Sequence, residues 1–127
     1  LIGLELSEVV TDSFVKDEEI SIIYEDATDD LLRVKNPIKN GLSFLSPNKI
    51  IGFCSVIQRN IYRKHTDLKL FEIGKHYLKD SEEEFLDIAL TGNKNIENWL
   101  EKPIKVDFYY GKGIIESLFT RFKVPYK

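Results

Sequence analysis

Two histidines and one cysteine are the first residues to consider for metal binding or nucleophilic chemistry. His65 and His76 have no cysteine or carboxylate at metal-ligand spacing, whereas a zinc site needs about four convergent nitrogen or sulfur ligands. Cys54 lies in the apolar run at residues 50–57, and no histidine stands nearby to activate it. We therefore expect a small buried thiol at Cys54, and we predict no metal ligand and no nucleophile.

A glycine-flanked lysine and one carboxylate are the remaining candidates for chemistry. Gly111-Lys112-Gly113 is similar to a phosphate-binding loop, but it lacks the full glycine spacing and the Lys-Ser/Thr ending, so we interpret it as a flexible entry to a helix. Glu72 lies within an apolar strand pattern and is either catalytic or an outward-facing or structurally paired side chain. The sequence leaves that choice open and predicts no catalytic or cofactor-binding residue.

Basic residues gather at one place, Arg59, Arg63 and Lys64. They fall near the C-terminal end of an expected helix, where cations complement the helix dipole. The alternative interpretation is a contact with RNA, although the chain as a whole is mildly acidic.

The composition is that of an ordinary globular protein. The 127 residues carry 18 basic and 21 acidic side chains, a net charge of -3, and 43% of them are hydrophobic. This composition argues against a disordered chain and against a dedicated nucleic-acid-binding surface. One cysteine excludes an internal disulfide, and no apolar stretch is long enough to cross a bilayer, so we predict a cytoplasmic protein with no membrane partner. The absence of methionine predicts an excised or processed piece of a longer protein.

Local patterns predict a mixture of helices and strands. Ser46 and Pro47 are typical of the start of a helix, and apolar residues then recur at spacings of three and four up to Ile61. In the first half of the chain, the patterns predict a helix end at residues 1–4 with Gly3 as terminator and a strand at 8–15. They then predict a strand or helix at 20–24, an acidic turn at 26–30, and a strand from 31 to 34 that Pro37 ends. The second half reads as a hairpin of strands 68–78 and 85–91 joined by an acidic turn at 79–84, a short segment with Trp99, and a helix at 114–119.

These elements predict the fold class. Strands mixed with non-alternating helices indicate an α+β fold with a mostly antiparallel sheet flanked by helices. No linker or repeat divides the chain, so we expect residues 1–127 to form a single domain.

A series of short motifs runs along nearly the whole chain. The most specific motif is the strand Leu70-Phe71-Glu72-Ile73-Gly74. The others are the helix-to-strand opening at residues 1–14, the Asn36-Pro37 turn before Leu42-Ser43-Phe44-Leu45, the helix from Ser46 to Asn60, Leu90-Thr91-Gly92-Asn93, Trp99, and Val106-Asp107-Phe108-Tyr109 with Lys112, Gly113 and Glu116. In this order the motifs resemble the catalytic-like module of the phenylalanyl-tRNA synthetase β subunit family, which is related in fold to the class II aminoacyl-tRNA synthetase core. Departures from the family pattern include Ser46 in place of an arginine, Asp12 in place of a tyrosine, and Leu100 in place of a glycine.

The resemblance implies a structural role. In such synthetases the α subunit holds ATP, phenylalanine and the aminoacylation chemistry, and the β module pairs with it without doing chemistry. It therefore implies no cofactor in this chain, ATP and magnesium in the whole complex, an α-subunit partner in an α2β2 assembly, and tRNA(Phe) bound through the complex.

Two alternatives remain from the sequence. The chain is a freestanding synthetase-like paralogue that binds an adenylate, for which Lys75 and Arg63 are the available cations, or it is a small RNA-binding module that uses Arg59, Arg63 and Lys64.

Overall fold

A computed structural model of the chain describes residues 1–24, 31–37, 41–95, 100 and 102–125. The chain divides into two compact units. The terminal unit comprises Leu1–Val9, Arg59–Phe71 and Ile88–Lys127, and the central unit comprises Val10–Gln58 and Glu72–Asp87. The predicted acidic turn at 26–30 and Trp99 lie outside the described residues.

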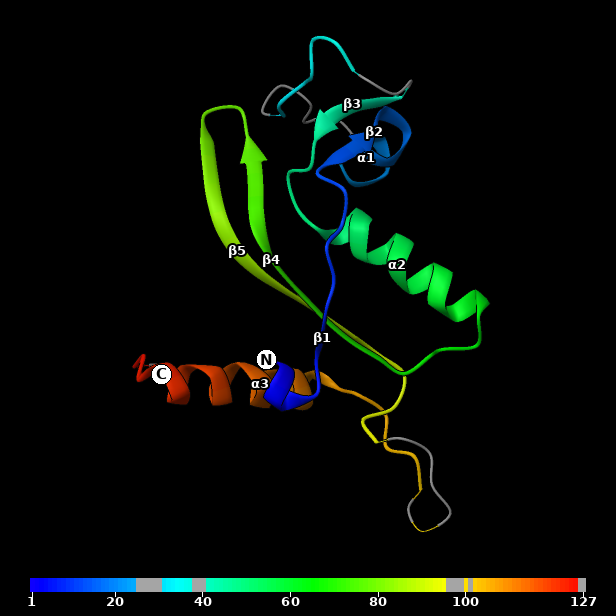
Figure 1. The fold of residues 1–127 in the computed structure, drawn as a ribbon, viewed down its shortest axis with the longest axis vertical. Helices are drawn as coiled ribbons and strands as arrows, with labels where there is room; N and C mark the ends of the chain where they lie inside the picture. Colours follow the sequence, from blue (N-terminus) through cyan, green and yellow to red (C-terminus); the bar gives the residue numbers. More distant parts are fainter. Residues whose placement is uncertain (25–30, 38–40, 96–99, 101, 126–127) are drawn as a thin grey trace. The chain divides into compact units, whose positions relative to one another are not determined.

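The three-stranded sheet has the order β1-β4-β5 (Figure 1). Strand β4, Leu68–Leu78, and strand β5, Ser81–Thr91, form a long hairpin whose turn is Lys79 and Asp80. The short strand β1, Ser7–Glu8, pairs in parallel with β4. The α+β class is confirmed, but the expectation of a mostly antiparallel sheet is not, because this sheet is mixed. The turn of the hairpin is also shorter than predicted, since Glu82–Glu84 belong to β5.

The central unit contains a second, two-stranded sheet. Strand β2, Phe14–Lys16, pairs antiparallel with β3, Leu42–Leu45. The single strand predicted at residues 8–15 is therefore wrong: β1 and β2 are separate, with residues 9–13 outside both. The strand expected at 31–34 is reduced to two isolated bridges, Leu31 with Leu78 and Arg33 with Phe44.

Two helices belong wholly or partly to the central unit. Helix α1, Asp17–Ile23, settles the ambiguity at residues 20–24 in favour of a helix, and its three acidic residues in the first turn suit the positive end of the helix dipole. Helix α2, Ile50–Tyr62, begins later than predicted. Ser46 is buried and donates its hydroxyl hydrogen to the Asn48 carbonyl, while the Asn48 side chain accepts from the Ile50 amide at 3.0 Å. The prediction that Ser46 caps this helix is therefore wrong.

The terminal unit contains a 3-10 turn, η1, Ile2–Leu4, and helix α3, Phe108–Phe122. The Asp107 side chain caps α3 by accepting from the Tyr110 amide at 2.8 Å, which explains why the helix starts six residues before its predicted position. Gly111-Lys112-Gly113 is consequently a stretch of helix, and the expected flexible entry is wrong. The first turn ends at Glu5, which has a left-handed conformation with φ 62°. The prediction that Gly3 ends this turn is therefore wrong.

Each unit has its own apolar core. The core of the central unit is formed by Val15, Ile20, Leu31 and Phe44. The core of the terminal unit is formed by Leu6, Phe71 and Ile114, with Leu1, Leu4, Ile88, Leu90 and Tyr110 packed against them. Segments that are far apart in the sequence thus meet in each unit, as expected for a fold stabilised by burial of apolar side chains.

Candidate functional site

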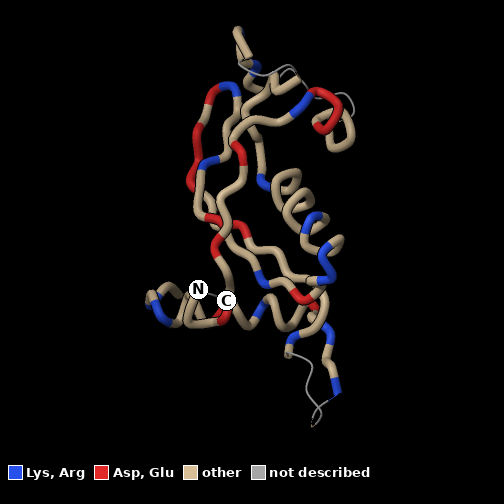
Figure 2. The backbone as a smooth tube through the Cα atoms, turned by 45° about the vertical axis from the view of Figure 1, so that its right-hand side comes forward, with Lys and Arg blue, Asp and Glu red and all other residues tan. Residues whose placement is uncertain are grey.

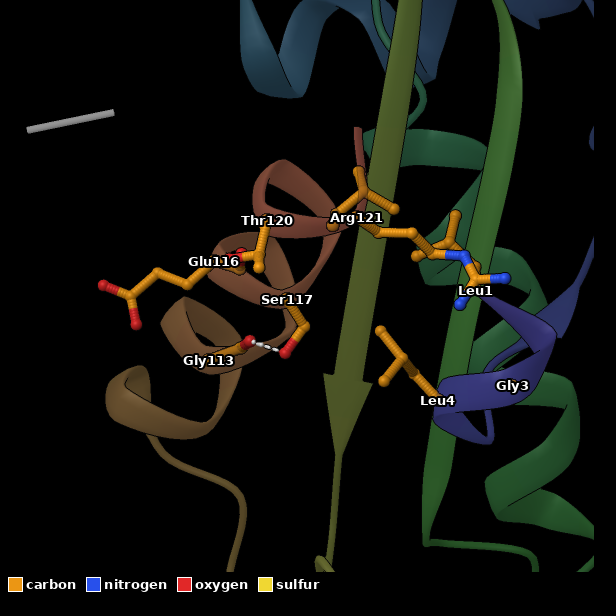
Figure 3. A pocket seen from close by; sticks show the side chains of 9 residues that line it. Leu1, Gly3, Leu4, Gly113, Glu116, Ser117, Thr120 and Arg121 are labelled. Carbon is orange, nitrogen blue, oxygen red and sulfur yellow. Dashed lines mark hydrogen bonds between the residues drawn. The ribbon is translucent and has the colours of Figure 1, made fainter. Parts of the chain in front are cut away.

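A groove of about 820 Å³ lies in the terminal unit between the first turn of the chain and α3 (Figure 3). One wall is formed by Leu1, Gly3 and Leu4, and the other is one face of α3. The Arg121 side chain extends across it toward Leu1 (Figure 3). The lining residues are Leu1, Gly3, Leu4, Gly113, Glu116, Ser117, Leu118, Thr120 and Arg121.

The polar side chains inside the groove are already satisfied by α3 itself. The Ser117 hydroxyl donates to the Gly113 carbonyl at 2.7 Å, and the Thr120 hydroxyl donates to the Glu116 carbonyl at 2.8 Å (Figure 3). Both bonds are the local back-bonding that short hydroxylated side chains make within helices. The two hydroxyl groups of the groove are therefore bonded within α3, and Glu116 and Arg121 supply its charged side chains.

Glu72, the most notable carboxylate of the sequence, lies in a buried ion pair of the central unit. The Lys49 Nζ atom is 3.0 Å from Glu72 Oε1, and both side chains are at most 5% exposed. The Thr11 hydroxyl donates to Glu72 Oε2 at 2.8 Å. Both carboxylate oxygens are thus engaged by the protein, so the geometry is that of the structurally paired alternative.

The two histidines lie in different surroundings. His76 Nε2 is 2.7 Å from Asp87 Oδ2, and its ring stacks on Phe85 with a centroid distance of 3.8 Å. His65 is exposed just after α2. Among the described residues, no three His, Cys, Asp or Glu side chains are grouped closely enough to hold a metal ion.

The basic residues Arg59, Arg63 and Lys64 are all exposed at the C-terminal end of α2. Within the part of the chain that the structure describes, none of the three has a carboxylate within 4 Å. The exposed ring of Tyr62 stands among them in sequence. The structure thus keeps these three residues together and solvent-accessible, which is compatible with either interpretation of the cluster.

The other candidates differ from their sequence interpretation. Cys54 is exposed, so the expectation of a buried thiol is wrong. Lys112 points to Glu116 one helical turn away, at 3.4 Å. Lys75, one of the two cations available to an adenylate, pairs with Glu82 across the hairpin at 3.0 Å, and this hydrogen bond raises the pKa of the Lys75 ammonium group.

A further ion pair holds the first turn of the chain to β4. Lys69 Nζ lies 2.9 Å from Glu5 Oε2 and also 5.6 Å from the centre of the Tyr110 ring. The hydrogen bond between Lys69 and Glu5 lowers the pKa of the Glu5 carboxyl and raises the pKa of the Lys69 ammonium. The hydrogen bond thus favours the charged form of both side chains.

Sequence reasoning missed Lys49, Thr11 and the groove. Lys49 carried a weak signal, since it is a lone lysine directly before an apolar run, but that position is also ordinary for a solvated lysine. The groove has no sequence signal of its own, because it arises where residues 1–4 meet residues 113–121.

The whole chain, residues 1–127, matches the family described as the phenylalanyl tRNA synthetase beta chain CLM domain. It is 36% identical over 129 residues to the phenylalanine–tRNA ligase beta subunit of Syntrophus aciditrophicus strain SB, an alignment that covers 94% of this chain and 16% of that protein. It is 32% identical over 137 residues to the corresponding subunit of Chlorobium luteolum, with coverage of 97% and 16%. The chain thus spans about one sixth of the length of these relatives.

The fold is similar to that of a solved pyrrolysyl tRNA synthetase, Desulfitobacterium hafniense PylSc. The TM-score is 0.56 and the sequence identity is 18%, and the match covers 68% of this chain and 33% of that one. None of the described helices is both long and apolar enough to traverse a lipid bilayer.

Proposed function

The chain belongs to the phenylalanyl tRNA synthetase beta chain CLM domain family, and we propose that in the whole β subunit it is a structural domain at a subunit interface, with no reaction centre of its own. Its partner in this proposal is the α subunit of phenylalanine–tRNA ligase, in an α2β2 assembly. The α subunit binds ATP and magnesium and aminoacylates tRNA(Phe), and the domain itself holds no cofactor. The assembly is proposed to be cytoplasmic.

One observation carries this proposal: α3 leaves large aromatic side chains uncovered. Phe108 is 77% exposed and Phe122 is 69% exposed, on a helix whose buried residue is Ile114. A large exposed apolar surface is often one that a partner covers. A domain that supports a neighbouring subunit has this property, whereas a catalytic domain needs convergent polar groups in a pocket.

The finer fold assignment and the domain organisation are parts of the same proposal. The similarity to the pyrrolysyl tRNA synthetase fold supports a class II synthetase-like core. The family match extends over both compact units, which supports their treatment as one domain of the β subunit.

The proposal is tested with the full-length β subunit co-expressed with the α subunit. Phe122→Asp is expected to shift the complex toward separate subunits in light scattering after gel filtration, because a buried carboxylate without a partner opposes association. Phe122→Leu, which keeps an apolar side chain at the same position, is expected to retain the assembly.

The same complexes distinguish a structural role from a catalytic one. Phenylalanine-dependent ATP–pyrophosphate exchange per assembled complex should change by no more than about twofold in His76→Ala and Lys112→Ala, since loss of a general acid or base costs about 100-fold or more. A loss of that size in an intact assembly would overturn the structural role.

A second candidate function is supported by the basic cluster at the end of α2. Arg59, Arg63 and Lys64 belong to the terminal unit, which carries 11 basic and 7 acidic residues. Contact with the tRNA backbone predicts that Arg63→Glu with Lys64→Glu weakens tRNA binding and flattens its salt dependence. The control is Lys35→Glu with Lys79→Glu in the central unit, and equal binding by both pairs of variants would remove this function. The adenylate-binding alternative stays a prediction.

A further inference from the structure

A pocket of about 520 Å³ in the terminal unit is bordered by lysine and tyrosine side chains. Lys94 and Lys105 line it together with Tyr109 and Tyr110, and we call these four residues the lysine–tyrosine site. Among the described residues that line the pocket, Asp107 supplies the one carboxylate, and its side chain is engaged as the cap of α3. The pocket therefore carries an excess of positive charge.

Backbone pairing brings the two lysines together. Asn93 and Lys105 form an antiparallel bridge, and the Lys94 amide donates to the Ile104 carbonyl at 2.6 Å. The Asn93 amide also donates to Asp67 Oδ1 at 2.8 Å, which ties this pairing to the residue before β4. Both lysines therefore start from backbone positions that the fold itself holds side by side.

Lys94 has an aromatic contact but no counter-ion among the described residues. Its Nζ atom lies 5.2 Å from the centre of the Tyr110 ring, and Lys69 Nζ lies 5.6 Å from the same ring. Lys69 has the Glu5 carboxylate at 2.9 Å. In the part of the chain that the structure describes, neither Lys94 nor Lys105 has a carboxylate within 4 Å. Because two ammonium groups beside one ring repel each other, an anion in contact with Lys94 is favoured.

The site also presents an exposed aromatic ring. Tyr109 is 76% exposed, and its ring packs edge-on against the ring of Phe108 with centroids 5.8 Å apart. Proteins bind single-stranded nucleic acids with this combination, since cations contact the phosphates and bases stack on the aromatic ring. An acidic peptide needs the cations alone, and a duplex keeps its bases stacked within itself.

We propose that the lysine–tyrosine site binds a single-stranded segment of RNA. Phosphates of the strand contact Lys94 and Lys105, and one base stacks on Tyr109. A pocket of about 520 Å³ has the size of a small-molecule site, so it holds one nucleotide while its neighbours run over the surface. The site is made of other residues than the basic cluster at the end of α2. The choice of RNA over DNA rests on the proposed function, in which the whole enzyme acts on tRNA(Phe).

Photo-crosslinking of RNA to the full-length β subunit in complex with the α subunit tests this inference. The probe is an oligouridylate of about eight nucleotides that contains one thiouridine, and mass spectrometry identifies the crosslinked peptides. In the wild type, a crosslink should form in the peptide that contains Tyr109. Lys94→Gln with Lys105→Gln should lower its yield at least about tenfold, because two phosphate contacts are lost. The matched control is Lys112→Gln, which removes a lysine of α3 outside the site and should leave the yield within about twofold of the wild type.

A pair of variants at Tyr109 separates base stacking from charge. Tyr109→Leu removes the aromatic ring and should lower the yield in the same peptide at least about fivefold. Tyr109→Phe keeps a ring for stacking and should leave the yield within about twofold of the wild type. Equal yields from these two variants would remove the stacked base and overturn the proposal.

Each other outcome also overturns the proposal. A wild-type complex without this crosslink has no such site. An equal yield from the same oligonucleotide paired with its complement, or full displacement by uridine monophosphate or polyglutamate, assigns another ligand to the pocket. An equal loss in Arg63→Glu with Lys64→Glu places the RNA on the cluster at the end of α2. Light scattering on the same complexes reports their assembly, so a failure of the proposed structural role is detected separately.

Discussion

The two units of this chain differ in charge and in what they enclose. The central unit carries 7 basic and 14 acidic residues, against 11 and 7 in the terminal unit. Figure 2 shows acidic residues along the β4–β5 hairpin near its turn. Among the described residues, the buried polar and charged side chains all belong to the central unit: Ser43, Ser46, Lys49 and Glu72.

The difference lies in the polarity of the side chains that each unit buries. The central unit buries the ion pair of Lys49 and Glu72. Because each buried charge needs its partner within hydrogen-bond distance, this pair restrains β4 and the loop before α2 relative to each other. The terminal unit has a purely apolar core. Both units expose large apolar side chains, such as Val10 and Ile22 in the central unit and Phe108 and Phe122 in the terminal unit, so the two units differ in the polarity of their interiors.

The strongest way to break this comparison is to remove one partner of the buried pair. Lys49→Met leaves the Glu72 carboxylate buried with Thr11 as its remaining partner, which should destabilise the central unit by about 3–5 kcal/mol. The measurement is the opening free energy of the β4 amides, from hydrogen exchange of the full-length subunit.

An exposed ion pair in the same unit provides the control for that experiment. Lys75 and Glu82 form an ion pair with the same 3.0 Å distance, but their side chains are about half exposed. Lys75→Met should therefore have little measurable effect, because exposed pairs are screened by solvent. If the two variants proved equally mild, the central unit would not enclose its charge as described. The double variant Lys49→Met with Glu72→Leu should recover most of the lost stability, since it leaves no unpaired charge.

The sequence predicted the hairpin and α2 because their patterns are local and long. β4 and β5 are 11 residues each, and α2 repeats apolar residues at helical spacing over 13 residues. Short elements were mispredicted where tertiary contacts decide. The run at residues 8–15 has the composition of one strand, but its two ends pair with different partners, β4 and β3.

The candidate site was less predictable than the fold for a physical reason. Glu72 could be singled out as an unusual carboxylate, but its state depends on Thr11 and Lys49, which are 61 and 23 positions away. The position of Asp107 as the cap of α3 was visible in principle, since aspartate is a favoured cap, but the glycines after it masked the helix. Spacing along a chain reports neighbours within an element and says little of contacts between elements.

Two glycines within helices, Gly52 and Gly111, differ in how closely the side chains around them pack. A Cβ atom on Gly52 of α2 would come within 2.6 Å of the Thr11 side chain, whereas one on Gly111 of α3 would meet only a Leu90 methyl group at 3.5 Å. Gly52→Ala should therefore push Thr11 away from Glu72 and cost about 1–3 kcal/mol. Gly111→Ala should stabilise α3 by about 0.5–1 kcal/mol, because alanine favours the helix and the space is free.

The same exchange experiment measures both glycine variants, on the amides of α2 and of α3. A stabilising Gly52→Ala would contradict the close packing of the central unit. A destabilising Gly111→Ala would show that α3 is more tightly covered on its β5 side than the open surface of the terminal unit implies.

The smallest expected effect concerns the ion pair of the terminal unit, Glu5 with Lys69, which lies largely in solvent on the Glu5 side. Folding lowers the pKa of Glu5, so its contribution to stability is present above the ordinary carboxyl pKa and is lost as the pH falls through the lowered value. Folding raises the pKa of Lys69, so that contribution is present below the ordinary lysine pKa and is lost as the pH rises through the raised value. The pair should thus stabilise the first turn between about pH 5 and pH 10.

Glu5→Gln removes the charge and keeps the size of the side chain, so it isolates this effect. At pH 7 it should slightly increase the exchange of the Glu5 and Leu6 amides, corrected for intrinsic rates, and below about pH 4 the difference from the wild type should shrink. Glu5→Gly loses the same charge but relieves the left-handed backbone, so it should protect the turn better than Glu5→Ala does. A Glu5→Gln effect that is independent of pH would mean that the turn is held by its backbone hydrogen bonds and apolar contacts alone. The terminal unit would then differ from the central unit even more sharply, since ion pairing would add nothing to its first turn.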